Sequence, residues 1–236
     1  MKRTPIVLLF TMYLALTSPA WGQTLEETPR DPARREAAGH DEGYLTLTVP
    51  ASDFNQVRYL LDYLLERSRD NSNLGNLTVA AEELTRAASL MRVDAGEGND
   101  DVQNEVYSAA DQLEKIARAA ETGSKTPVSV FDSAIFDAHR AIAHYHQRRA
   151  RTLMEATMET NAGLALQAAL LHYEHAAVAA ARMRSRPADP DLYAQVDDWE
   201  KIAELMIHNE NQNTPLALET IDQLGDRIRM LGGAVN

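Results

Sequence analysis

Histidine is the residue type in this chain that is best suited to chemistry, and three histidines could share one site. The three are His146, His172 and His175. His172 and His175 are three positions apart, so on a helix they lie on the same face. A helical hairpin that turns near Asn161 would bring His146 level with them. Imidazole nitrogen is a ligand that zinc, copper and nickel accept readily, so the three residues form a candidate transition-metal site.

The alternative is that these histidines are partly exposed side chains on ordinary helix surfaces. The chain has no Glu-x-x-His pair of the kind found in carboxylate-bridged di-metal bundles, and no His-Glu-x-x-His motif. His139 lies two turns before His146, on the same stripe as Ile135 and Ile142. Because no carboxylate stands at a ligand spacing, the surface interpretation is favoured and metal binding is kept as the alternative.

Motifs for catalysis are absent from the sequence. There is no glycine-rich phosphate loop and no Gly-x-Ser-x-Gly elbow. Cysteine is also absent, which excludes disulfides, thiolate metal sites, iron–sulfur clusters and a cysteine nucleophile. We therefore predict no catalytic residue, no cofactor and no enzymatic activity.

The charge of the chain limits its partners. Against 23 lysines and arginines there are 35 aspartates and glutamates, for a net charge of −12. Such an acidic chain repels nucleic-acid phosphates, so we predict no nucleic-acid partner. Two basic clusters could form an anion or partner patch, but local salt bridges are the favoured interpretation. The clusters are Arg148, Arg149 and Arg151, and Arg182, Arg184 and Arg186.

The first residues read as an export signal. Residues 1–22 combine Lys2 and Arg3, an apolar run and the small residues of a cleavage site, which is typical of a secretory signal peptide. Residues 23–51 are polar at first and then β-prone, and are expected to be disordered or extended. No later segment has the apolar length of a membrane span. We expect a periplasmic or secreted protein with no stable membrane insertion after signal cleavage.

Hydrophobic periodicity predicts an all-α fold of about seven helices, arranged as an antiparallel bundle or a short α-solenoid. The longest runs from 127 to about 159, roughly 33 residues or about 50 Å. Its apolar face carries Phe131, Ile135, Ala138 and Ile142. The other helices are expected over residues 52–69, 74–93, 99–121, 164–184, 191–208 and 214–233.

Three short segments of the chain recur in the same order, which is the pattern of an internal repeat. The matches are Leu113–Ala117 with Trp199–Ala203 at an offset of 86, Thr126-Pro127 with Thr214-Pro215 at 88, and Ala87–Arg92 with Ala179–Arg184 at 92. This pattern predicts an internal duplication in one helical domain, with halves 53–143 and 144–231. The long helix would be shared, closing one half and opening the other.

The sequence therefore favours a non-enzymatic protein-interaction or scaffolding module of the periplasm or cell envelope. Its partners would be other proteins or further copies of itself, and its contact region would be the hairpin near residues 139–186. The alternative function is transition-metal or small-ligand binding through His146, His172 and His175.

Overall fold

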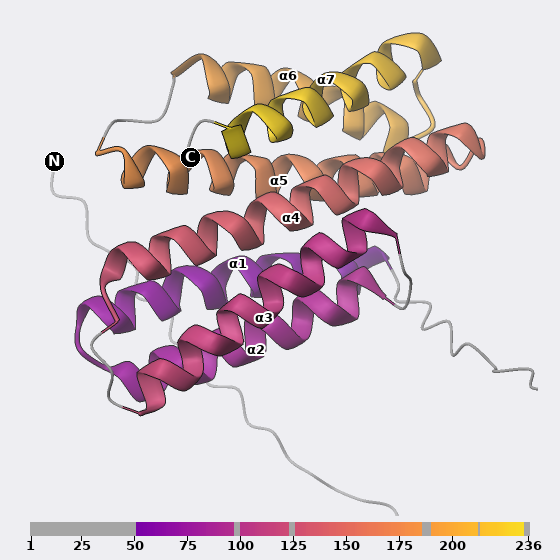
Figure 1. The fold of residues 1–236 in the computed structure, drawn as a ribbon. Coiled ribbons are helices and arrows are strands. Elements are labelled where there is room, and N and C mark those ends of the chain that lie inside the picture. The colour runs from indigo at the N-terminus through magenta and orange to yellow at the C-terminus, as the bar shows by residue number, and fades with distance from the viewer. Residues whose placement is uncertain (1–50, 97–99, 123–125, 186–189, 212, 234–236) are drawn as a thin grey trace, which may run out of the picture. The chain divides into compact units, whose positions relative to one another are not determined.

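A computed structural model describes residues 51–96, 100–122, 126–185, 190–211 and 213–233. Within these ranges the chain forms seven helices and no strand, which confirms the all-α prediction (Figure 1). The helices are α1 (Ala51–Asn73), α2 (Leu77–Ala95), α3 (Asp101–Glu121), α4 (Val128–Glu155), α5 (Glu159–Met183), α6 (Pro190–Ile207) and α7 (Thr214–Gly233). The predicted signal peptide, and all but the last residue of the predicted extended segment, fall outside the described residues.

The helices α4 and α5 run side by side, with α1 and α3 packed on α4 and with α6 packed on α5 (Figure 1). Their faces are built largely from alanine, which has the highest helix propensity and lets two helices approach closely. Ala138, Ala141 and Ala143 of α4 are fully buried or nearly so, as are Ala165, Ala168 and Ala169 of α5. The alanine-rich composition therefore produces a central hairpin with little space between its two helices.

Two clusters of buried apolar side chains make up most of the core, and α4 contributes to both. The first joins α1, α2 and α3 to the N-terminal half of α4, from Phe131 to Ile142. The second joins α5, α6 and α7 to the C-terminal half of α4, from Ala143 to Met154. Each fully buried Phe, Ile or Leu contributes about 1.5–3 kcal/mol relative to an exposed position. α4 is therefore held along its whole length.

The turn between α4 and α5 lies earlier than the sequence indicated. The expected break was at 160–163, but α4 ends at Glu155 and has 28 residues rather than about 33. Thr157 adopts a left-handed conformation with φ of 59°. The N–H of Met158 donates to the carbonyl of Leu153, and the N–H of Thr157 donates to that of Met154. These two bonds satisfy carbonyls at the helix end in the arrangement of a Schellman motif, so α4 stops here without a glycine.

Gly163 suggested a break in the sequence, but it lies inside α5 and serves helix packing. A β-carbon at this position would come within 2.8 Å of the carbonyl oxygen of Ala203 and 2.9 Å of the amide nitrogen of Ile207. Real β-carbons do not approach backbone atoms this closely, so only glycine permits the observed contact between α5 and α6. The physical role of this glycine is close approach rather than chain reversal.

None of the helices in the described ranges has the combination of length and apolar character that crossing a bilayer would require.

Candidate metal centre

Three buried histidines lie inside the helix group, at the contact between α4 and α5. His139 is 0% exposed, and His146 and His172 are each 1% exposed. The first two lie on the packed face of α4, and His172 lies on the facing side of α5. A buried imidazole still needs partners for its ring nitrogens, so these positions are informative in a core that is otherwise mostly apolar.

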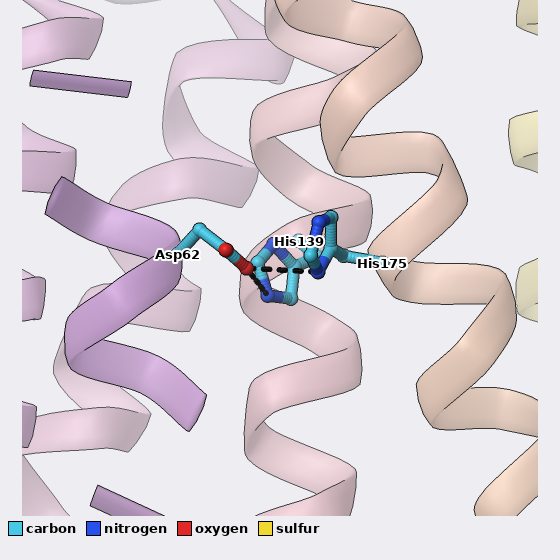
Figure 2. A group of neighbouring side chains, drawn as sticks. All are labelled: Asp62, His139 and His175. Atoms are coloured by element: carbon cyan, nitrogen blue, oxygen red, sulfur yellow. Dashed lines mark ion pairs between the residues drawn. The ribbon is translucent and has the colours of Figure 1, made fainter. Parts of the chain in front are cut away.

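One group of side chains has the geometry of a metal site, and it brings together three helices (Figure 2). It consists of Asp62 from α1, His139 from α4 and His175 from α5. Asp62 Oδ1 lies 2.8 Å from His175 Nδ1 and 3.8 Å from His139 Nε2. One ligand atom from each residue falls within 4.8 Å of the others. Because the three residues are far apart in the sequence, only the packing of α1 against the α4–α5 hairpin creates this group.

One of the three ligand atoms is buried without a hydrogen bond. His139 Nε2 has no hydrogen-bond partner among the described residues, whereas Asp62 Oδ1 is buried in an ion pair with His175 Nδ1 at 2.8 Å. A buried polar atom left in this state costs about 1–3 kcal/mol. Asp62 and His175 keep about a quarter of their side-chain surface exposed, at 21% and 27%. The group is thus buried on the His139 side and reachable from solvent on the other side.

A fourth side chain, His172, touches the group from behind. His139 Nδ1 and His172 Nδ1 are 3.0 Å apart, which is a hydrogen-bond distance between two ring nitrogens. A neutral imidazole has one N–H and one lone pair, so this contact holds only if one of the two nitrogens carries the proton. If His139 donates, its Nε2 presents a lone pair to the Asp62 carboxylate. If His172 donates, the Nε2–H of His139 faces an oxygen 3.8 Å away, too far for a hydrogen bond.

The electrostatic environment acts on the two candidate ligand histidines in opposite directions. Burial, together with the positive charges that His172 and His175 can carry, holds the pKa of His139 well below its usual value. Burial also lowers the pKa of His175, but the adjacent Asp62 carboxylate more than offsets this and raises it. His139 is therefore neutral near pH 7, which is the form that binds a metal.

The three histidines predicted from the sequence are close together, but their ligand atoms do not form one group. The rings of His146 and His172 stack with centroids 6.4 Å apart and planes 10° apart. However, His146 Nε2 lies 2.7 Å from Asp94 Oδ2 of α2, and the ligand group found among the described residues contains His175 but not His146 or His172. Ring contacts at 5.2 Å instead join His139 to both His172 and His175.

The position of the turn explains this difference. A turn near Asn161 places His146 opposite residue 177 or so, whereas the observed turn at Thr157 places His139 opposite His175. The turn lies about four residues earlier, so the pairs of residues that face each other across the hairpin shift by about eight residues, which is about two helical turns. The sequence pattern places His139 on the apolar face of the long helix, but it does not indicate Asp62 as a ligand. The only signal for Asp62 was a carboxylate next to the apolar positions Leu61 and Leu65, and that signal could not identify the helix that it faces.

The basic clusters predicted from the sequence are partly neutralised by acidic side chains of the same helix and of other helices. Arg151 pairs with Glu155 and Asp222, and Arg182 pairs with Glu66. A surface depression of about 380 Å³ contains equal numbers of arginines and carboxylates, which gives it no net attraction for an anion. Its lining residues are Gln147, Arg148, Arg151, Thr152, Glu155, Asp222, Asp226 and Arg229.

The residues of the group fit a divalent transition metal. Zinc lies about 2.0–2.2 Å from imidazole nitrogen and carboxylate oxygen, so its tetrahedral ligands are about 3.3 Å apart. The observed separations of 2.8 and 3.8 Å lie on either side of that value. Two imidazoles and one carboxylate are also a ligand set of catalytic zinc and of non-haem iron sites, in which further positions remain open to water.

Comparisons of the chain with known protein families, with curated proteins and with solved structures found no match.

For the metal-free protein, His139 and His175 together predict a free energy of unfolding that is highest near pH 6.5. The unfolded chain protonates His139 below about pH 6.5 while the folded chain does not, so the free energy of unfolding falls as the pH decreases. The raised pKa of His175 acts oppositely, because the folded chain keeps a proton that the unfolded chain loses, so stability falls as the pH rises above about 6.5. The ionisable groups that act on His139 are Asp62, His172, His175 and Arg182.

Denaturant unfolding with a chelator present, between about pH 5 and 8, measures both slopes. His139→Gln should remove the loss on the acid side, which is at most about 1.4 kcal/mol per pH unit for one group. His175→Asn should remove the loss on the alkaline side. The exposed His208, changed to Gln, is the control. A wild-type acid slope in His139→Gln would contradict the assignment.

Proposed function

We propose that this protein binds one divalent transition-metal ion through Asp62, His139 and His175, and that it binds the ion without catalysing a reaction. The observation that carries the proposal is the buried Nε2 of His139. It has no hydrogen-bond partner among the described residues and faces Asp62 Oδ1 and His175 Nδ1. A cation between the three atoms would supply the partner that His139 Nε2 lacks in either tautomer, and it would also bind the Asp62 oxygen that now pairs with His175.

The donor set indicates the class of ion. Two neutral imidazoles and one carboxylate suit zinc, iron(II), cobalt(II) or nickel(II), whereas calcium and magnesium prefer sites made of oxygen alone. The single carboxylate neutralises half of the charge of a divalent ion. The absence of cysteine from the chain means that no thiolate can take part. The location proposed for this activity is the periplasm or the cell exterior, and it rests on the signal-like residues 1–22.

We expect one zinc ion per chain, and we expect binding to depend on the three ligands. When the free zinc concentration is about 100 times the dissociation constant, the free energy of unfolding should rise by about 2.7 kcal/mol and the melting temperature by about 5–10 °C. Asp62→Asn, His139→Gln and His175→Asn should each weaken binding by more than about 100-fold, because loss of an outer partner alone costs about 10–100-fold. Competition with a chromophoric chelator measures the affinity.

His208→Gln is the control for adventitious binding by an exposed histidine, and His146→Gln separates the two ligand sets. Affinity should be unchanged in His208→Gln, and in His146→Gln it should fall far less than in the three ligand variants, because His146 contacts the group only through His172. If it is lost with His146→Gln and kept with Asp62→Asn, the set His146, His172 and His175 is the correct one. Absence of stoichiometric zinc binding by the wild-type protein would end the metal hypothesis.

A second candidate function is protein interaction, and an exposed apolar strip on α1 supports it. Tyr59, Leu60 and Tyr63 lie within one turn and are 56%, 45% and 51% exposed. Aromatic residues are enriched at protein interfaces, and the overall negative charge of the chain does not favour a nucleic acid. The α4–α5 hairpin is a weaker contact surface because much of it is buried, including the packed faces of both helices.

If the α1 strip contacts a second copy, sedimentation should show association that increases with protein concentration. Leu60→Glu combined with Tyr63→Glu should abolish it, since two buried charges would replace apolar contacts. Met230→Glu, at another exposed apolar position on α7, should leave it unchanged. A wild-type protein that stays monomeric at every concentration would contradict self-association through this strip.

We also retain the internal duplication as a proposal, with α4 as the shared helix. The pattern of burial supports it, since each of the eight buried residues of α2 has a buried counterpart 82 positions later in α5. A spacing of 86 residues relates the buried residues of α3 and the first half of α4 to those of α6 and α7. Leu84 and Leu166 are a pair at the spacing of 82. Pairs at the spacing of 86 are Leu113 with Trp199, Ala117 with Ala203, Ile135 with Ile221 and Ile142 with Ile228. The 82-residue spacing differs from the 92 inferred from the Ala87–Arg92 match.

In an experimental structure, residues 53–143 should superpose on 144–231 with their helices in the same order and at these two spacings. A best superposition in another helix order would contradict the duplication.

A further inference from the structure

His172 stands directly behind the candidate metal ligand His139. It is 1% exposed, and its Nδ1 lies 3.0 Å from His139 Nδ1. It comes from α5, three positions before the ligand His175, so one face of one helix supplies both residues. Asp62, His139 and His175 form the ligand group without it, so its role is not that of a ligand.

The Nδ1–Nδ1 contact decides which nitrogen of His139 is available. A metal binds the lone pair of a neutral imidazole, and the other ring nitrogen of that imidazole then carries the proton. The Nδ1 of His139 is in contact with His172, whereas its Nε2 faces Asp62 Oδ1 at 3.8 Å. With an ion at Nε2, the proton must therefore lie on Nδ1, and His172 Nδ1 must accept it.

We propose that His172 is a positioning residue that accepts a hydrogen bond from His139 Nδ1 and so directs His139 Nε2 to the metal ion. The proposal rests on the metal binding proposed above and identifies the outer partner of that site. Metal-binding histidines commonly donate their second N–H to such a partner, which sets both the tautomer and the ring orientation. Here the partner is an imidazole rather than a carboxylate, so it adds no negative charge to the site.

Ring contacts on both sides hold His172 in place for this role. Its ring lies 5.2 Å from that of His139 and stacks on that of His146 at 6.4 Å, with planes 10° apart. His146 is in turn fixed by Asp94 from α2, at 2.7 Å. The acceptor nitrogen is therefore set by packing from two other helices and needs little ordering when an ion binds.

Two substitutions of His172 distinguish a role as a hydrogen-bond acceptor from a role in packing alone. Asparagine has an oxygen attached to Cγ, as histidine has Nδ1, so His172→Asn can still accept from His139. Leucine fills similar space and cannot accept. His144→Asn is the control for the same substitution at another histidine, because His144 lies on α4 and contacts Glu105, outside the group.

The experiment measures zinc affinity by chelator competition and the visible spectrum of the cobalt(II) form, for the wild-type protein and the three variants. His172→Leu should weaken zinc binding by about 10–100-fold and alter the cobalt spectrum, as loss of an outer partner does. His172→Asn should lose less than about tenfold and keep the wild-type spectrum, and His144→Asn should match the wild type. Melting of the metal-free variants reports whether they are folded.

Wild-type affinity in His172→Leu would overturn the proposal, and so would an equal loss in the Asn and Leu variants, which would indicate a role in packing alone. If His172→Leu does not fold, ¹⁵N NMR of the zinc-bound wild-type protein decides the matter. A protonated Nδ1 and a metal-bound Nε2 in His139 support the proposal, and metal bound at Nδ1 overturns it. Zinc binding that depends on Asp62 but not on His172 would leave the proposed function intact, whereas no zinc binding by the wild type would overturn both.

Discussion

The close packing of α4 against α5 is the interaction on which the rest of the structure depends. Alanines on both helices bring the two backbones near each other, and His139, His146 and His172 are buried among them. The turn at Thr157 then sets which residues of the two helices are level with each other. Because both core clusters include part of α4, the other helices take their places from this pair.

Burying ionisable groups in such a contact costs desolvation free energy, which contacts between the buried side chains offset in part. The groups form a row that crosses the interior from Asp62 on α1 to Asp94 on α2, through His139, His172 and His146. Most neighbouring members are within hydrogen-bond or ring-contact distance, so their polar atoms are largely satisfied. In the gap between Asp62 and His139, the buried Nε2 of His139 has no hydrogen-bond partner among the described residues and faces a carboxylate oxygen 3.8 Å away. A buried imidazole nitrogen in that position supports the ion site proposed at this gap.

The helices were predictable from sequence, because apolar residues at steps of three and four and the turn-forming residues between them are local signals. The main error in the helix boundaries has a physical explanation. Gly163 falls in the break that the helix pattern predicts, but it permits α5 to contact the backbone of α6 at Ala203 and Ile207. Thr157 forms the turn instead, and a β-branched residue that rarely adopts positive φ gives no turn signal in a sequence. A glycine has the same appearance in a sequence whether it serves a turn or a close contact.

The sequence by itself determined the class of the fold, the near-complete helical content of the domain and the presence of a histidine-rich hairpin without cysteine. These follow from periodicity and composition, which act over a few residues. Only the tertiary structure decided that His139 rather than His146 faces His175, and that Asp62 completes the group. The reason is that a change of about four residues in the position of the turn changes every side-chain pairing between the two helices. The choice of α1 as the neighbour depends on contacts between residues that are more than 70 positions apart.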